Sequence, residues 1–156
     1  MAATVENTTI EAWVSFLRSH AAITRELSAQ LQRDHGLTIN DYECLLHLSR
    51  AEGGMLRRVD LAERVILTAS GITRLLDGLE RQGFVEKATC SSDARVSYAK
   101  LTDQGHEKLR EAAKTHLAGI DELFTSAYSG SELATLSDLL SRLPMTGAEC
   151  SRSCSP

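Results

Sequence analysis

Small and polar side chains gather in the middle of the chain, where residues 68–74 read TASGITR. Hydroxyl groups there can hydrogen-bond base edges or phosphates, a methyl group can meet a thymine methyl, and an arginine can reach guanine. Within a winged helix, this composition predicts the leading end of a helix that enters a DNA major groove, with these contacts: Thr68, Ala69, Ser70, Thr73 and Arg74. The alternative is that Thr68 and Ser70 only cap a helix and that Arg74 is a solvated surface charge.

A second group of candidate DNA contacts lies in the polar segment 89–95, TCSSDAR. Arg95 can enter a narrow minor groove, where the negative potential is strongest. Asp93 is expected to orient the Arg95 guanidinium, because phosphate repels a carboxylate. The alternative is a plain surface ion pair, which contributes little. Hydroxyls and further cations complete the predicted surface: Ser91, Ser92, Arg57, Arg58 and Lys87.

The residues around these candidates predict the elements that position them. Val59, Leu61, Ala62 and Val65 predict a short helix, and a tight break follows at Ile66–Leu67. The next helix begins at Thr68 and ends at Gly83, with one apolar stripe at helical spacing: Ile72, Leu75, Leu76 and Leu79. Strands are expected over 84–88 and 96–101, with 55–57 as a short third strand. Helix, turn, helix and hairpin together predict a winged helix whose wing is the segment 89–95.

Amphipathic helices flank this unit on both sides. A long helix over 8–35 is expected to begin with a capping box of Thr8 and Glu11, and a second helix opens at 40–43. Thr102 is expected to cap a helix running from Asp103 to about Ser126. Ser129 begins a last helix that stops at Pro144, and residues 144–156 form a small polar tail that is expected to be disordered.

Two segments resemble the multiple antibiotic resistance regulator (MarR) family of bacterial winged-helix transcription factors. They are ITRLLDGLERQGFVEK at 72–87 and SDARVSYAKLTDQG at 92–105. The matching marks are the leucine-rich recognition helix ending in Leu-Glu-x-x-Gly, the Asp-x-Arg of the wing, and Leu-Thr-x-x-Gly opening the next helix. The resemblance implies a homodimer that binds a palindromic operator in double-stranded DNA and usually represses until a small molecule or an oxidant releases it.

The expected organisation is one mainly α domain over residues 1–156 with a small β hairpin. Residues 40–102 form the DNA-binding lobe, and residues 8–35 and 103–143 supply dimerisation helices. The terminal helices carry more apolar side chains than a small winged-helix core can use: Ile10, Trp13, Phe16, Leu17, Leu123, Phe124, Tyr128, Leu133, Leu136 and Leu140. A two-fold symmetric dimer would bury them, and the alternative is a monomer that folds these helices on itself.

The resemblance also implies an effector site between the DNA-binding lobe and the dimer helices. A small aromatic or anionic effector is expected there, lined by aromatic and imidazole side chains: Trp13, Phe16, His20, Tyr42, His47 and His116. The competing interpretation for each of them is core packing, since aromatic residues at helical spacing usually lie in cores.

The chain has four cysteines, which leave open an alternative function: a regulator of the same fold that senses oxidation through its cysteines. Cys44 is expected to be buried and inert. Cys90 in the wing, or Cys150 with Cys154 in the tail, could instead form an oxidation switch. The reactive-cysteine motif of the family's peroxide sensors is missing near the N-terminus. No cofactor is expected, and no metal site either, because no dense His/Cys/Glu cluster has zinc spacing.

The net charge of −4 conceals an uneven distribution. From Arg57 to Lys100 there are eight basic and six acidic residues, whereas the rest of the chain has nine basic and fifteen acidic residues. A local positive field within an acidic body suits an oriented approach to DNA.

No long apolar run or secretory signal is present, so a cytoplasmic location is expected. The chain has no Gly-x-Ser-x-Gly, no phosphate-binding glycine loop and no His-Glu-x-x-His, so we expect no enzyme. A winged helix used only for protein contacts is the remaining alternative.

Overall fold

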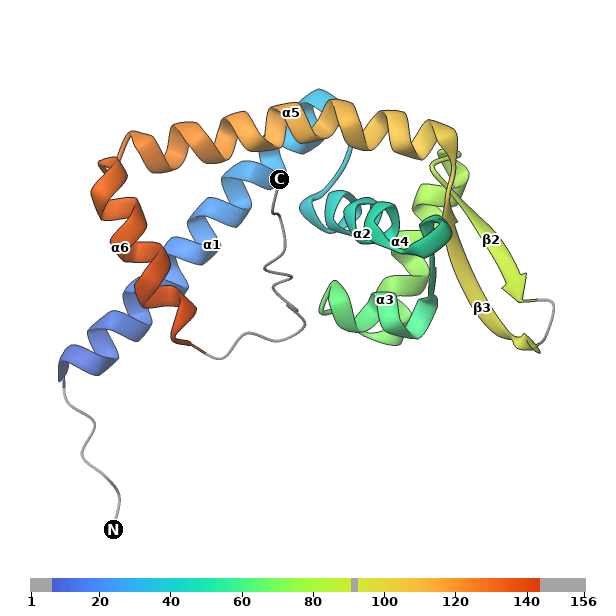
Figure 1. Ribbon diagram of the computed structural model, residues 1–156, viewed down its shortest axis with the longest axis horizontal. Coiled ribbons are helices and arrows are strands. Elements are labelled where there is room, and N and C mark those ends of the chain that lie inside the picture. Colours follow the sequence, from blue (N-terminus) through green and yellow to red (C-terminus); the bar gives the residue numbers. More distant parts are fainter. Residues whose placement is uncertain (1–6, 91–92, 144–156) are drawn as a thin grey trace, which may run out of the picture.

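The computed structural model describes residues 7–90 and 93–143, and for 89–90 and 93–96 it describes the backbone only. Six α-helices and three strands follow one another along these residues (Figure 1). The order is α1 (Asn7–His35), α2 (Ile39–Arg50), a 3-10 turn (Glu52–Gly54), β1 (Met55–Arg57), α3 (Arg58–Arg64), α4 (Ala69–Arg81), β2 (Val85–Cys90), β3 (Asp93–Leu101), α5 (Asp103–Thr125) and α6 (Gly130–Ser141).

The winged helix predicted from the sequence is present. Helices α3 and α4 are followed by a three-stranded antiparallel sheet in the order β1-β3-β2. In β1, Leu56 pairs with Ala99, and in β2, Val85 pairs with Leu101. The predicted third strand over 55–57 is therefore confirmed. The two long strands reach further than predicted, because β2 includes residues 89–90 and β3 begins at residue 93.

One continuous apolar core holds the lobe together and extends onto α1 and α5. Nine of its members illustrate its reach through the lobe helices, the sheet and α5: Leu31, Leu45, Leu48, Leu61, Ile72, Leu76, Leu79, Ala99 and Leu109. The apolar stripe predicted for α4 is confirmed, with Leu79 fully buried and Leu75 partly buried against the core. The core therefore fixes α4 by one face and leaves its other face to solvent.

Local hydrogen bonds explain where most helices begin. Thr102 caps α5 by accepting from the Gly105 amide at 3.0 Å, and Ser129 forms a capping box with Glu132, as predicted. Two predicted caps are wrong. Thr8 lies inside α1, which already includes Asn7. The N-cap of helix α2 lies two residues earlier than predicted, at Thr38 instead of Asn40, because Thr38 forms a capping box with Asp41.

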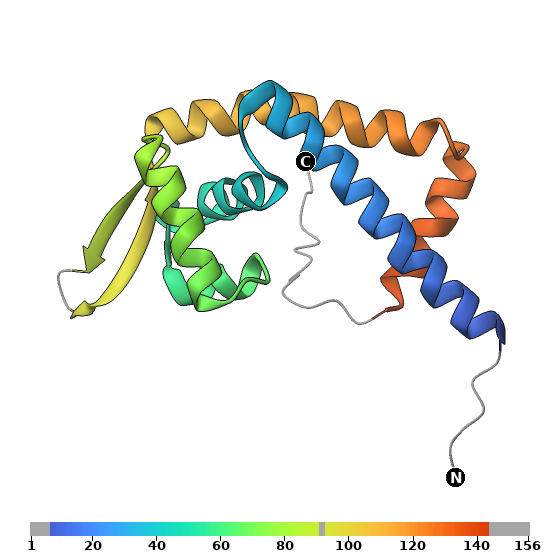
Figure 2. The ribbon, with the colours of Figure 1, turned by 180° about the vertical axis from the view of Figure 1, so that it is seen from behind.

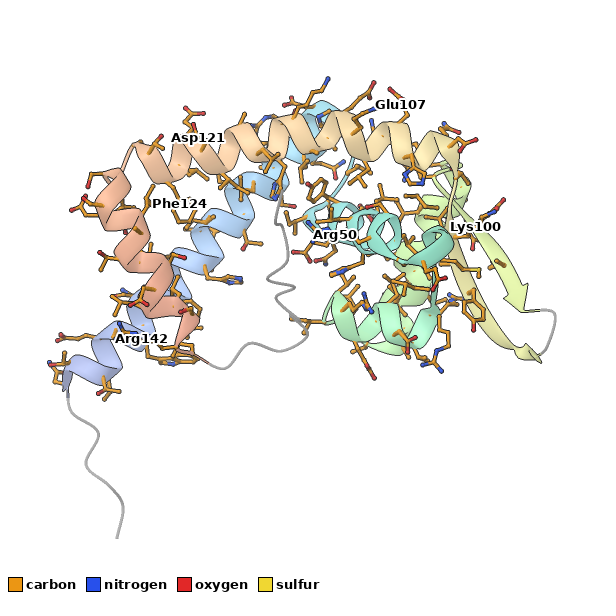
Figure 3. The ribbon with its side chains drawn as sticks, in the orientation of Figure 1. Arg50, Lys100, Glu107, Asp121, Phe124 and Arg142 are labelled. Atoms are coloured by element: carbon orange, nitrogen blue, oxygen red, sulfur yellow. The ribbon has the colours of Figure 1, made fainter. Side chains whose placement is uncertain are left out.

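Helices α1, α5 and α6 extend away from the lobe. Figures 1 and 2 show α5 running along one side of the molecule, with α6 and the N-terminal part of α1 at the end opposite the sheet. Only Leu27 and Leu31 are buried in α1, and α6 has no buried residue. Figure 3 shows Phe124 on the side of α5 that faces α1 and α6, while Asp121 and Glu107 lie on the outer side. These helices therefore present apolar side chains that the chain itself leaves uncovered.

None of the helices within residues 7–90 and 93–143 combines the length and the apolar character needed to cross a lipid bilayer.

Candidate nucleic-acid interface

The outward face of α4 carries the predicted recognition residues. Because Ile72, Leu76 and Leu79 point into the core, the opposite face at 3.6 residues per turn contains Ser70, Arg74, Asp77 and Arg81. Ser70, Arg74 and Arg81 are exposed, and Asp77 is half-buried. Sequence reasoning named Ser70 and Arg74 but missed Asp77 and Arg81. Their spacing of three and seven residues from Arg74 was the signal that could have found them.

Hydrogen bonds at the N-terminus of α4 occupy part of the predicted contact set. The Thr68 hydroxyl accepts from the Gly71 amide at 3.1 Å and lies 3.2 Å from the Ser70 hydroxyl. The Thr73 hydroxyl donates to the Ala69 carbonyl at 2.9 Å. Thr68 is therefore the N-cap that the sequence predicted, and the exposed methyl group of Ala69 stands in the first turn beside it. Each hydroxyl oxygen still has lone pairs that an outside donor can use.

The wing residues occupy one end of the β2–β3 hairpin. Asp93 and Arg95 lie in β3, and Cys90 lies in β2, where its Cα pairs with that of Asp93. The register shifts between Thr89 and Cys90, which marks an irregularity just before the turn. Ser91 and Ser92 lie outside the described residues. The hairpin therefore supplies backbone positions for Asp93 and Arg95 on a strand rather than in the long loop that the sequence predicted.

Several cations near this surface already have acidic partners within the chain. Arg57 donates from Nε and from a terminal nitrogen to the two Asp60 carboxylate oxygens, each at 2.8 Å. Lys87 Nζ lies 3.1 Å from Glu80 Oε2 and 4.0 Å from Asp77 Oδ1, both on α4. Their positive charge is thus partly balanced locally, which reduces the contribution expected of Arg57 and Lys87. Arg58 differs, because one terminal nitrogen is buried without a hydrogen-bond partner among the residues that the structure describes.

The six candidate effector residues divide into two groups and one separate residue. Trp13, Phe16 and His20 follow one another along α1, with ring centroids 6.3 and 6.4 Å apart, and all three are exposed within the chain. Tyr42 and His116 form a second pair whose ring centroids are 4.5 Å apart. Core packing describes Tyr42, which is buried, but it does not describe Trp13 or Phe16.

A surface hollow of about 710 Å³ lies beside the first group, between α1 and the start of α2. His20 lines it together with Arg25, Gln32 and Thr38. Burial raises the pKa of the neighbouring Glu43, an effect that the charge of His20 opposes. His47, the separate candidate, is half-buried, and burial with the charges of Arg64 and Arg50 lowers its pKa.

Cys44 is fully buried in α2, as predicted. Burial raises the pKa of its thiol to about 12, and the negative charge of Asp41 makes a smaller contribution in the same direction. The thiol therefore stays protonated and unreactive. Cys150 and Cys154 lie outside the described residues. Among residues 7–90 and 93–143, no group of three or more His, Cys, Asp or Glu side chains could hold a metal ion.

Comparisons with known proteins agree with this geometry. Residues 35–96 match the MarR family. The crystal structure of AbsC, a MarR family transcriptional regulator from Streptomyces coelicolor, is 32% identical and superposes with a TM-score of 0.78 over 89% of this chain and 93% of that one. Sco3205 from the same organism, solved in complex with DNA, is 27% identical with a TM-score of 0.79 over 89% and 90% of the two chains.

A curated relative gives the same result at the level of sequence. The transcriptional repressor YetL of Bacillus subtilis is 33% identical over 112 residues, which span 69% of this chain and 66% of that relative, just under two thirds of its length. The match to AbsC, which covers nearly the whole of both chains, confirms the resemblance seen in the recognition helix and the wing. The chain belongs to the MarR family of DNA-binding transcriptional regulators.

Proposed function

We propose that this protein is a homodimeric repressor that binds a palindromic operator and is released by a small-molecule effector. The observation that carries the proposal is the outward face of α4, where small and polar residues at the leading end are followed by two exposed arginines, Arg74 and Arg81. A helix fixed by its apolar face, with an exposed polar face of this kind, suits entry into a major groove.

The proposed DNA contacts are of two kinds. Residues of the first α4 turns would read bases and touch phosphates: Thr68, Ala69, Ser70, Thr73 and Arg74. Three residues of the wing would contact the neighbouring minor groove and backbone: Ser91, Ser92 and Arg95. Asp93 would orient the Arg95 guanidinium, because phosphate repels a carboxylate. Arg81 extends the first set along the outward face of α4. Arg57 and Lys87 would contribute less, because acidic side chains pair with them.

The uncovered apolar side chains of α1 and α6 support the homodimer. Trp13 on α1 is 58% exposed and Leu139 on α6 is 50% exposed, at the end of the molecule opposite the sheet. Leu143, two residues beyond the end of α6, is 51% exposed. A second copy related by a two-fold axis would cover the same side chains on both chains at once. Such a pair would place two α4 helices in successive major grooves, about 10 base pairs apart.

An effector site between the lobe and the long helices is the second part of the proposal. The hollow beside His20 and Arg25 offers cationic and amide donors, and the Tyr42–His116 pair joins α2 of the lobe to α5. These side chains suit a small aromatic or anionic molecule. Effector binding there would release the protein from the operator by changing the angle between the two lobes of the dimer.

Genome-wide capture of bound fragments, followed by fluorescence anisotropy on the recovered palindrome, tests the proposal. Affinity for the palindrome should exceed that for a scrambled duplex by a factor of at least about 10³, and it should fall steeply with salt. The variants Arg74→Ala and Arg95→Ala should each weaken binding, while Arg110→Ala, at an exposed site on α5, should not. Equal affinity for the palindrome and the scrambled duplex would contradict the proposed function.

A further inference from the structure

Ile66, in the turn between α3 and α4, has an unusual conformation for its residue type. Its φ is +56°, and it is the one residue other than glycine with positive φ among the residues that the structure describes. Its side chain is 81% exposed, more than any other large hydrophobic side chain in those residues. A β-branched residue is sterically disfavoured in the left-handed region, and an exposed isoleucine adds nothing to the core.

The same turn occurs elsewhere in the chain with glycine in the equivalent place. At the end of α3, the Leu67 amide donates to the Ala62 carbonyl at 2.9 Å, and the Ile66 amide donates to the Glu63 carbonyl at 3.3 Å. At the end of α4, the Phe84 amide donates to the Leu79 carbonyl at 3.0 Å, and the Gly83 amide donates to the Glu80 carbonyl at 2.9 Å.

Both turns have the hydrogen-bond pattern of a Schellman motif, which places a left-handed residue just after the helix and favours glycine there. Gly83 fulfils this preference with φ of +78°, whereas Ile66 does not. Glycine at residue 66 would form the same hydrogen bonds with less strain. Folding alone therefore gives no reason for the isoleucine side chain.

The position of Ile66 indicates what the side chain could contact. It lies two residues before Thr68, the N-cap of the recognition helix. Figures 1 and 2 show α3 and the far ends of β2 and β3 on the side of the molecule away from α5. Val59, on α3, is a second exposed apolar residue close by in the sequence, with an exposed fraction of 63%. The turn thus borders the edge at which the recognition helix and the wing would approach DNA.

We infer that Ile66 is a further DNA-contacting residue, whose side chain packs against apolar groups of the operator, either thymine methyl groups or deoxyribose carbons. The inference rests on the proposed operator binding and adds a residue to it. An apolar contact with a thymine methyl carries sequence information, whereas a contact with a sugar contributes affinity alone.

Two substitutions separate the side chain from the strained backbone. Ile66→Gly removes both the side chain and the strain, so the melting temperature should rise by about 2–4 °C, as expected for a chain of this size. Ile66→Ala removes most of the side chain but leaves a Cβ at positive φ, so no such rise is expected. Both variants should bind the operator roughly tenfold more weakly than the wild-type protein, while Ile66→Leu should retain most of the affinity.

Operators with deoxyuridine in place of single thymidines distinguish the two apolar groups. If a substitution weakens binding by the wild-type protein but not by Ile66→Ala, the contact is with that thymine methyl. If every substitution is neutral while Ile66→Ala still binds weakly, the contact is with deoxyribose. Wild-type affinity in both Ile66→Gly and Ile66→Ala would overturn the inference and leave the proposed function intact. Failure of the wild-type protein to bind any operator would instead overturn the proposed function.

Discussion

The ring of Tyr42 in α2 lies against the ring of His116 in α5, with centroids 4.5 Å apart and planes tilted by 49°. Tyr42 is 5% exposed, and Nδ1 of His116 is buried without a hydrogen-bond partner among the described residues. Burial lowers the pKa of His116 and raises that of Tyr42. This contact, which joins the DNA-binding lobe to a long helix, therefore favours a neutral imidazole.

The first prediction follows from the lowered pKa of His116. The unfolded chain takes up a proton as the pH falls through the ordinary histidine value of about 6.5, whereas the folded protein resists protonation until a lower pH. Stability should therefore be fully present above pH 6.5 and should fall as the pH drops below it. Urea unfolding at pH 7.5 and at successive steps down to pH 5 measures this loss.

His116→Phe is the matched variant for this experiment, because it keeps an aromatic ring against Tyr42 and removes the titrating group. Its stability should depend less on pH over the same range. Some dependence should persist, since burial also lowers the pKa of His47. An unchanged pH profile in His116→Phe would show that the loss of stability arises from other groups.

The second prediction concerns two helical glycines with opposite surroundings. A Cβ on Gly105, at the start of α5, would collide with the backbone carbonyl of Phe84 and stand 2.6 Å from Cδ1 of Leu101. Gly105→Ala should therefore destabilise the protein by about 1–3 kcal/mol or more, as expected for overpacking against a backbone atom. A Cβ on Gly78, within α4, would meet nothing within 4 Å.

Gly78→Ala is accordingly the control for Gly105→Ala, and it should stabilise the protein by up to about 1 kcal/mol through helix propensity. Urea unfolding of both variants at one pH gives the comparison. Two variants of equal stability would contradict the close approach of α5 to Phe84, the residue that precedes β2.

The third prediction tests the proposed dimer through α6. Leu136 lies on the apolar face of this helix, which the chain leaves without any buried residue. Leu136→Asp should yield monomers, because a carboxylate buried in a two-fold interface occurs twice and has no partner. Light scattering on a sizing column measures the mass.

Ala134 lies on the opposite face of α6 and is exposed. Ala134→Asp adds the same charge without touching the apolar face, so this variant should stay dimeric. If Leu136→Asp also stays dimeric, the interface lies elsewhere on the molecule.

The fourth prediction concerns Lys87, whose ammonium group lies 3.1 Å from the Glu80 carboxylate and 4.0 Å from that of Asp77. Helix α4 carries both carboxylates along with Arg74 and Arg81, so its own charges cancel. Lys87 should therefore aid DNA binding by shielding phosphate from the two carboxylates. Lys87→Gln should weaken operator binding several-fold but change folding stability by less than about 1 kcal/mol, because the Lys87 side chain is largely exposed.

A double-mutant cycle separates this role from a direct phosphate contact. In an Asp77→Asn, Glu80→Gln background, Lys87→Gln should have little further effect on affinity. If Lys87→Gln costs the same affinity in both backgrounds, Lys87 touches the DNA itself. Fluorescence anisotropy at two salt concentrations measures the operator affinity of Lys87→Gln in the wild-type background and in the Asp77→Asn, Glu80→Gln background.

The sequence by itself determined the order of the elements and most helix ends. Thr68, Thr102 and Ser129 begin helices, and Gly83 ends one, because each acts on backbone groups within a few residues of itself. The apolar stripe of α4 was equally readable, since a helix buries residues at a regular spacing. The cap of α2 was misplaced at Asn40 because Thr38, two residues earlier, is a competing cap of similar type.

Only the tertiary structure decided which side chains from distant segments meet. The Tyr42–His116 contact, the pairing of Lys87 with α4 and the close approach of Gly105 to Phe84 each join separate elements. The positive φ of Ile66 also escaped the sequence, because its residue type favours the opposite sign, whereas the Schellman hydrogen bonds at the end of α3 place a left-handed residue there. Local hydrogen bonding is encoded within a few residues, whereas these contacts depend on how the core brings whole helices together.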